Sequence, residues 1–282
     1  MTQTPLIVTS EADLRGQIWA WRGRGETIGF VPTMGALHDG HLSLAAKAKT
    51  RASKVVASIY VNPAQFAEGE DLDSYPRQIQ KDAHMLQSAG CDLIYTPSNM
   101  YGPNHSTAVN VSGPALGLET DYRPHFFGGV ALIVTKLLNR VQPDIAVFGE
   151  KDYQQLLTIK RLTADLDMPV QIIGAPIVRE ADGLAMSSRN QYFDTKGRAI
   201  AGKLNVIMRA CAASIAKGHS IETAASNAKK DLSAAGFDSV DYVALAHSQT
   251  LELLREKWRG EPARLLIAGH CAGVRLIDNC AL

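Results

Sequence analysis

The sequence predicts an α/β protein in which a Rossmann-like, doubly wound parallel sheet is followed by a second, smaller α+β domain. Residues 1–180 alternate short apolar runs, rich in valine and isoleucine, with longer segments of helical periodicity. This βαβα order is typical of a parallel sheet with helices on both faces. After residue 180 the pattern changes to alanine-rich helical segments followed by strands. We therefore predict domains at residues 1–180 and 181–282.

The apolar runs of the first domain are the predicted strands, because strands buried on both faces carry unbroken apolar sequence. They cover residues 27–34, 55–62, 91–97, 144–150 and 170–178. The segments between them place apolar residues three and four positions apart, as one face of a helix does. These predicted helices cover residues 41–50, 79–90, 130–141 and 153–166, and the second ends at Gly90 as a helix C-cap would. Ligands of such sheets bind at the carboxyl ends of the strands.

The predicted second domain begins with two alanine-rich amphipathic helices, at residues 199–218 and 221–236. Three strand-like segments follow, at residues 240–247, 264–273 and 274–279. The polar stretch 179–193 is the predicted junction between the domains.

Composition narrows the class of protein. Of 282 residues, 46% are hydrophobic and 20% charged, which is typical of a globular chain. Lys and Arg number 29 against 28 Asp and Glu, so no broad basic surface is available for a nucleic acid. The N-terminus lacks the features of a signal peptide, and no apolar window is long enough for a membrane span. We expect a soluble, cytoplasmic protein without a nucleic acid or membrane partner.

The four cysteines lie far apart and include no C-x-x-C pair, so neither a zinc site nor a disulfide framework suits them. They are Cys91, Cys211, Cys271 and Cys280. We expect thiols buried in the protein, which fits a reducing compartment.

The strongest chemical signal is the segment VPTMGALHDGHLSL, in which a buried strand leads through Met34 and Gly35 to the start of a helix. A helix N-terminus at the end of a sheet is an anion site. His38 and His41 are three residues apart, so both can donate to phosphate oxygens from one helical face. Gly40 allows a phosphate to approach the backbone. Capping or core histidines are one alternative, and a metal site, which lacks a third ligand nearby, is another.

Two further segments suit a nucleotide triphosphate. The sequence AMSSRN offers the hydroxyls of Ser187 and Ser188 and the planar cation of Arg189, although a polar linker explains the same residues. The sequence FGEKDYQQL places Lys151 and Asp152 directly after a predicted strand, although a solvated helix start explains them as well.

These motifs, together with YVNPAQF and the EDLDSYPR that follows it, resemble in order and spacing those of the pantoate–β-alanine ligase family between residues 27 and 195. H-x-G-H by itself would indicate only a wider nucleotidyltransferase superfamily. The resemblance implies a homodimer in which the carboxylate of (R)-pantoate attacks the α-phosphorus of MgATP. β-Alanine then displaces AMP from the resulting pantoyl adenylate, giving pantothenate.

The resemblance also assigns site residues. ATP would be held by Met34, Gly35, Ala36, Leu37, His38, Asp39, Gly40 and His41, by Gly149, Glu150, Lys151 and Asp152, by Val178, and by Met186, Ser187, Ser188 and Arg189. His41 takes the proton-donor role, and His38, Lys151 and Arg189 act with it. Gln65 and Gln155 contact pantoate, where an amide can both donate and accept. Asn62 is expected to help hold Mg²⁺ or substrate, with no dedicated protein metal site.

The chain departs from the family at RPHFFGGV, where His125 replaces a glycine and Phe126 a histidine, while Arg123 and Lys136 still match. We expect Gly128 and Gly129 to form a flexible entry to the helix that follows, with a phenylalanine turned inward.

Two other functions fit parts of the sequence. A nucleotidyltransferase that moves a nucleotide onto a phosphate substrate shares H-x-G-H but does not need Gln65 and Gln155 in a hydroxy-acid pocket. A non-catalytic nucleotide-binding module shares the fold. Four residues speak against it: His38, His41, Lys151 and Arg189.

Overall fold

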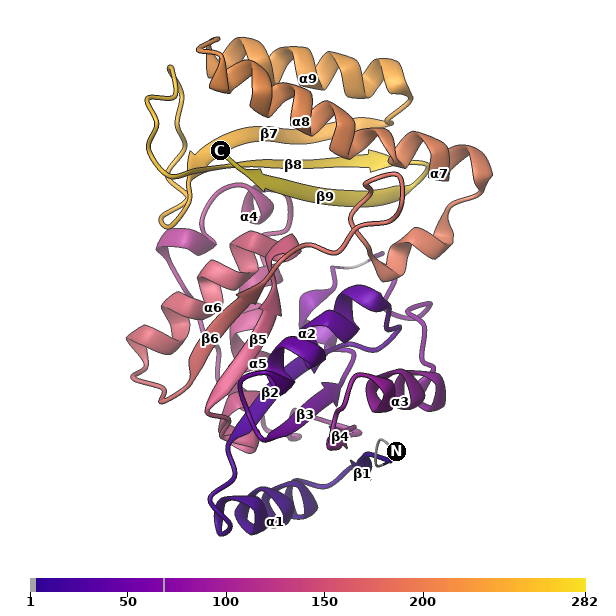
Figure 1. Cartoon of the computed structure of the whole chain (residues 1–282), viewed down its shortest axis with the longest axis vertical. Coiled ribbons are helices and arrows are strands. Elements are labelled where there is room, and N and C mark those ends of the chain that lie inside the picture. Colours follow the sequence, from indigo (N-terminus) through magenta and orange to yellow (C-terminus); the bar gives the residue numbers. More distant parts are fainter. Residues whose placement is uncertain (1–3, 68) are drawn as a thin grey trace.

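The larger of two sheets has six parallel strands in the order β1-β4-β3-β2-β5-β6 (Figure 1). We describe the chain from a computed structural model, which describes residues 4–67 and 69–282. The strands are β1 (Leu6–Val8), β2 (Ile28–Thr33), β3 (Lys54–Ile59), β4 (Leu93–Tyr95), β5 (Ile145–Gly149) and β6 (Gln171–Ala175). Strand order reverses direction at β2, which pairs with β3 on one side and β5 on the other. A crevice at such a switch point is where doubly wound sheets bind ligands.

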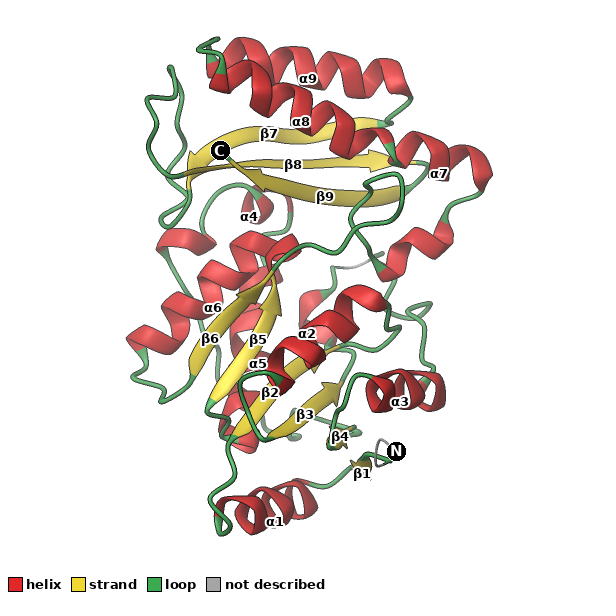
Figure 2. Cartoon of the chain, in the orientation of Figure 1, coloured by secondary structure: helices red, strands yellow, loops and turns green. Residues whose placement is uncertain are grey.

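Helices accompany this sheet, drawn in red in Figure 2. They are α1 (Glu11–Arg22), α2 (Asp39–Lys49), α3 (Ile79–Ser88), α4 (Glu119–Tyr122), α5 (Phe126–Val141) and α6 (Tyr153–Asp165). Helices α1, α5 and α6 share one core cluster with the sheet, whereas α2 and α3 share another. The alternation of strand side chains explains this division, because Phe30 points into the first cluster and its neighbour Val31 into the second.

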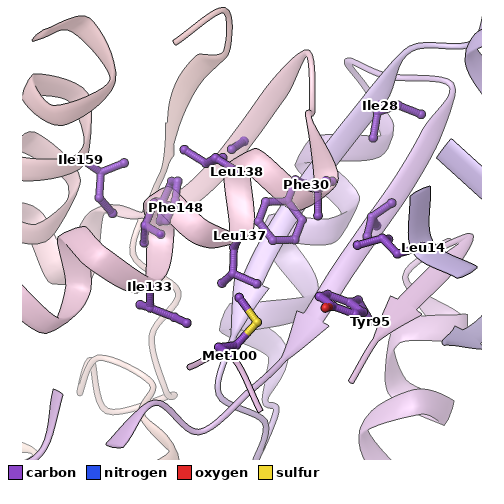
Figure 3. Close-up of a cluster of buried hydrophobic side chains, with 14 of the residues drawn as sticks. Leu14, Ile28, Phe30, Tyr95, Met100, Ile133, Leu137, Leu138, Phe148 and Ile159 are labelled. Carbon is purple, nitrogen blue, oxygen red and sulfur yellow. The ribbon is translucent and has the colours of Figure 1, made fainter. Parts of the chain in front are cut away.

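The first cluster contains the largest buried side chains of the sheet (Figure 3). Phe30 is fully buried, and its register partners Val56 and Ala146 lie in the same cluster. Leu137 of α5 and Phe148 of β5 pack there as well. Burying one side chain of this size stabilises a fold by about 1.5–3 kcal/mol, so this cluster is what holds the carboxyl ends of β2 and β5 in place.

The C-terminal unit has a three-stranded antiparallel sheet, which α8 and α9 cover on the side away from the larger sheet (Figure 1). Its elements are α7 (Thr195–Ala201), α8 (Lys203–Ala216), α9 (Ile221–Ala235), β7 (Ser239–His247), β8 (Ala263–Cys271) and β9 (Val274–Ala281). By length and composition, Thr195–Ala216 is the one described stretch apolar enough to cross a membrane. Leu204 and Met208 of this stretch are buried in the C-terminal core.

The predicted strands and helices are confirmed, with ends that differ by a few residues, except that the predicted helix 199–218 is divided at Gly202 between α7 and α8. The sequence did not predict β1, α1 or α4. The expectation of a flexible entry at Gly128 and Gly129 is wrong, because α5 begins at Phe126 and includes both glycines. A Cβ on Gly129 would lie 2.1 Å from the carbonyl oxygen of Ala64, so this glycine permits close packing instead.

The inward phenylalanine is Phe127, which is 4% exposed. The expectation of buried thiols is confirmed for Cys91, Cys211 and Cys271, whereas Cys280 is only partly buried. Burial raises the pKa of the Cys91 thiol to about 12, so this cysteine stays protonated and unreactive.

Candidate active site

The segments that leave β2 and β5 meet at the switch point of the larger sheet. They line a cavity of about 740 Å³ with Met34 and His41 from the first segment and Lys151 and Asp152 from the second. This is the edge at which the sequence predicted a ligand site. Three residues of the 179–193 junction, Ser187, Arg189 and Tyr192, line the same cavity. The cavity therefore gathers residues from all three predicted nucleotide motifs.

The turn between β2 and α2 is held by a carboxylate that the sequence did not predict. Asp82 of α3 is 1% exposed and accepts from the backbone N–H groups of Ala36 and Leu37, at 3.1 and 3.0 Å. Gly35 and Ala36 both take positive φ there, at 87° and 51°. The N–H groups of Ala36 and Leu37 are therefore satisfied within the protein. An acid in the first turn of a helix is common, so no local signal marked Asp82.

His38 and His41 cap the start of α2 through the same ring atom. The Nδ1 of His38 accepts from the backbone N–H of Gly40 at 3.1 Å, and the Nδ1 of His41 accepts from that of His38 at 3.4 Å. The capping alternative is thus correct in part. Because Nδ1 accepts in both rings, each neutral imidazole carries its proton on Nε2, where it remains a donor. The ring centroids are 4.1 Å apart.

Both imidazoles are neutral at neutral pH. Burial, followed by the charge of Lys151, lowers the pKa of His38 from 6.5 to about 4. Burial lowers the pKa of His41 further, to about 3, with smaller contributions from His38 and Lys151. Desolvation disfavours the charged form of a histidine. In the free protein His41 is accordingly a hydrogen-bond donor, and an imidazolium proton donor is not formed.

The two histidines face different cavities. His41 lines the larger one, whereas His38 lines a neighbouring cavity of about 320 Å³ together with Ala36, Leu37 and Ser188. Ser187 lines both cavities. The remaining predicted nucleotide residues line neither: Gly35, Asp39, Gly40, Gly149, Glu150, Val178 and Met186. Val178 and Met186 do lie together, since the Met186 N–H donates to the Val178 carbonyl at 3.0 Å.

The C-terminal sheet clamps the segment that carries Lys151. Asn279 of β9 is 2% exposed, and its Nδ2 donates to the carbonyls of Glu150 and Lys151, both at 2.9 Å. Arg264 of β8 donates to the Glu150 carboxylate at 3.1 Å and lies 3.9 Å from the ring centroid of Tyr153. The sequence did not predict these contacts, because more than 110 positions separate the partners along the chain.

Arg189 is paired with a residue from the loop after β3. Its guanidinium donates to both carboxylate oxygens of Asp71, at 2.6 and 3.0 Å. Two further bonds join the same segments, from Tyr192 to Asp71 at 3.4 Å and between Tyr75 and Ser188 at 3.3 Å. The structure thus brings the predicted cation to the cavity but engages it with an internal carboxylate.

The two glutamines of the QQ pair have different surroundings. Gln155 lines the larger cavity, as does Gln65. Gln154 is 3% exposed, and its Nε2 donates to the carbonyls of Pro114, Leu116 and Gly117. The first glutamine therefore holds a loop, and the second is available to a ligand.

The divergent loop supports the same wall of the cavity. Arg123 donates to both carboxylate oxygens of Glu70, at 2.7 and 3.0 Å, and to the carbonyl of Gln65 at 3.1 Å. The Phe126 ring lies under this guanidinium, 4.0 Å from it. Phe126 therefore stacks on the cation that orients the Gln65 backbone.

A buried ionic network joins the two units of the chain. Glu119 is 6% exposed, receives two bonds from Arg275 at 2.7 and 2.8 Å, and accepts from Tyr242 at 2.6 Å. These hydrogen bonds lower the pKa of Glu119 despite its burial. Because Arg275 lies in β9, the network fixes the C-terminal sheet against the segment before α5.

Comparison with known proteins gives a consistent result. The model of the pantoate-beta-alanine ligase family matches residues 6–281. The chain is 50% identical over 283 aligned residues to the pantothenate synthetase of Maricaulis maris, covering 100% of this chain and 98% of that protein. The crystal structure of pantothenate synthetase from Thermus thermophilus superposes with a TM-score of 0.90 at 42% identity, covering 98% of each chain.

A third relative is a ligand complex. Pantoate-beta-alanine ligase from Francisella tularensis, complexed with beta-gamma ATP and beta-alanine, has a TM-score of 0.83 at 31% identity. The match covers 98% of this chain and 97% of that one.

Proposed function

The chain belongs to the pantoate–β-alanine ligase family, and from this premise we propose the route of its reaction and the residues that carry it. The carboxylate of (R)-pantoate attacks the α-phosphorus of ATP, and the bond from that phosphorus to the bridging oxygen breaks, releasing pyrophosphate. The amine of β-alanine then attacks the acyl carbon of pantoyl adenylate. The bond between the acyl carbon and the AMP oxygen breaks, the amine loses a proton, and pantothenate and AMP leave.

The observation that carries this proposal is the pair of neutral imidazoles at the switch point. Each holds a proton on Nε2, and the charge of Lys151 acts on both. Charge grows on the phosphate oxygens as the carboxylate attacks, so preoriented donors stabilise the transition state more than the substrate. His41 in the larger cavity suits the α-phosphate, and His38 in the smaller one suits the departing phosphates.

The other predicted residues take supporting roles. Lys151 and Arg189 neutralise phosphate charge, and Arg189 must leave Asp71 to do so. Ser187 and Ser188 donate to phosphate oxygens, and Gln65 and Gln155 contact pantoate. Mg²⁺ arrives with ATP and reduces the charge on the phosphates. No group of three or more His, Cys, Asp or Glu gathers among the described residues, so such an ion would take its ligands mainly from phosphates and water.

We further propose that residues 181–282 act as a lid. Support comes from β9, whose Arg275 and Asn279 line the larger cavity. A lid excludes water from the adenylate, which is a reactive mixed anhydride. Like its family, the enzyme would act in the cytoplasm as a homodimer, and sedimentation velocity measures that state.

The decisive experiment is exchange of labelled pyrophosphate into ATP. Exchange that requires pantoate but not β-alanine supports the adenylate, and AMP must then appear when β-alanine is added. Pyrophosphate release only with β-alanine present supports a concerted route. Exchange without pantoate, or transfer of AMP onto a phosphate substrate, supports the nucleotidyltransferase.

A further inference from the structure

We propose that Tyr101 is a positioning residue: acting through Asn62, it fixes the Gln65 side chain so that the NH₂ end, and not the oxygen end, is offered to the acid substrate. The inference rests on the proposed role of Gln65 as a substrate contact. An amide in general can donate or accept, so its two ends select different ligand atoms.

The orientation begins at a backbone carbonyl. The Nδ2 of Asn62 lies 3.2 Å from the carbonyl oxygen of Gly129, which can only accept, so this end of Asn62 must be its NH₂ group. Its second hydrogen points to Gln65, where the partner at 2.9 Å is Oε1. The Oδ1 of Asn62 accepts from the Tyr101 hydroxyl at 2.6 Å. The Gly129 carbonyl therefore sets which end of Asn62 faces Gln65, and the Tyr101 hydroxyl holds the opposite, Oδ1 end in place.

Packing keeps this chain in place. Asn62 is 1% exposed, and both ends of its side chain are engaged by protein groups. In this structure both ends of Asn62 thus have protein partners, and a contact from Asn62 to Mg²⁺ or substrate stays a prediction. Gly129 can approach because it lacks a Cβ, which would meet the Ala64 carbonyl oxygen at 2.1 Å.

The Tyr101 hydroxyl remains a donor at physiological pH. Burial, with the neighbouring Tyr60, raises the pKa of Tyr101 to about 12. The backbone of Gln65 is held separately, since its carbonyl accepts from Arg123 at 3.1 Å. Main chain and side chain of Gln65 are thus fixed by different partners.

The consequence is a preference for ligand atoms that accept. With Oε1 committed to Asn62, Gln65 has its two Nε2 hydrogens for the larger cavity. They suit a carboxylate, carbonyl or hydroxyl oxygen of a hydroxy acid and reject an ammonium group. Gln65 therefore selects the acid substrate over the amine.

The test compares Tyr101→Phe with Tyr95→Phe. Both changes remove one hydrogen-bonded hydroxyl. The Tyr95 hydroxyl accepts from Arg140 at 2.7 Å, and Tyr95 has no bond to Asn62 or Gln65 among the described contacts, so Tyr95→Phe is the matched control. We expect Tyr101→Phe to raise the KM for pantoate roughly five- to tenfold with the KM for ATP within twofold, and Tyr95→Phe to change neither. The proposal would be overturned if the KM for pantoate stays within twofold of wild type in Tyr101→Phe. It would also be overturned if the KM values for pantoate and ATP rise equally.

A second pair of variants reports which end of Gln65 is used. Gln65→Glu replaces the NH₂ by an oxygen, whereas Gln65→Ala removes both ends. We expect calorimetry to find weaker pantoate binding in Gln65→Glu than in Gln65→Ala, because oxygen faces oxygen. Equal or tighter binding in Gln65→Glu would show that the oxygen end is the functional one. Failure of the wild type to bind pantoate or form AMP would contradict the proposed function itself.

Discussion

Asp71 and Arg189 form a two-point ion pair, 2.6 and 3.0 Å long, between residues that both line the larger cavity. The arrangement of donor fork and carboxylate resembles that of an arginine on a phosphate. Asp71 is therefore paired with the arginine that the proposed reaction needs. For Arg189 to bind a phosphate of the nucleotide, the phosphate must replace the Asp71 carboxylate.

Replacing Asp71 by asparagine should tighten ATP binding. The variant keeps the size of the side chain but removes the charge that competes for Arg189, so we expect the KM for ATP to fall roughly three- to tenfold, about 0.7–1.4 kcal/mol. Steady-state kinetics measures this, with the exposed Asp73→Asn as the matched control. If the KM for ATP instead rises as much as in Arg189→Ala, the ion pair is needed to form the ATP site and the prediction is wrong.

Replacing His41 by alanine should abolish most turnover without unfolding the protein. Loss of one preoriented transition-state donor costs roughly 10²- to 10³-fold in kcat. The variant also loses the bond to the His38 N–H, worth about 1 kcal/mol as a helix cap. Kinetics and a thermal melt are the measurements, with His84→Ala on the exposed side of α3 as control. Activity within a few-fold of wild type in a folded variant contradicts the proposed role.

The lowered histidine pKa values predict acid lability. In the folded state His38 titrates at about 4 and His41 at about 3, against 6.5 when unfolded. As pH falls below 6.5 the unfolded chain takes up protons that the folded chain does not. The free energy of unfolding therefore decreases with falling pH until the pH reaches the folded pKa values. Urea unfolding from pH 7 to 4.5 should show this slope, shallower in His41→Gln but unchanged in His84→Gln. An equal slope in His41→Gln contradicts it.

Asn279→Ala should affect stability and nucleotide binding together. It leaves two partly buried carbonyls, at Glu150 and Lys151, without this donor. At about 1–3 kcal/mol for a buried group left unpaired, we expect a loss of about 2–4 kcal/mol and a higher KM for ATP. Urea titration and kinetics of Asn279→Ala and of the exposed Asn227→Ala test this. If Asn279→Ala is destabilised but its KM for ATP is unchanged, the bonds from Asn279 stabilise the fold without contributing to ATP binding.

Restoring the family pattern with His125→Gly and Phe126→His should change the KM for pantoate and for β-alanine by less than about tenfold. In the described structure His125 makes no side-chain bond at the start of α5, and an imidazole can stack on Arg123 as Phe126 does. Kinetics with both substrates is the measurement. A larger improvement for either would show that the native loop changes substrate preference.

Much of the fold was predictable because local sequence carried it. Apolar runs marked the central strands, and the H-x-G-H segment after the first of them marked the start of α2. The short β1 was missed because a three-residue edge strand has little periodicity, and Leu6 and Ile7 are about half exposed. Gly129 was misread because a glycine needed for close packing and one needed for flexibility are identical in sequence.

What the sequence by itself determined is the set of side chains near the switch point: His41, Lys151, Gln65 and Gln155 follow or flank predicted strands, whose carboxyl ends must meet at one edge. Tertiary structure decided how those side chains are engaged. Asp82 takes the turn N–H groups, Asp71 takes Arg189, and Tyr101 orients Gln65 through Asn62. These partners come from other elements and depend on packing geometry. Because a hydrogen bond tolerates errors of only a few tenths of an ångström, periodicity and spacing cannot predict it.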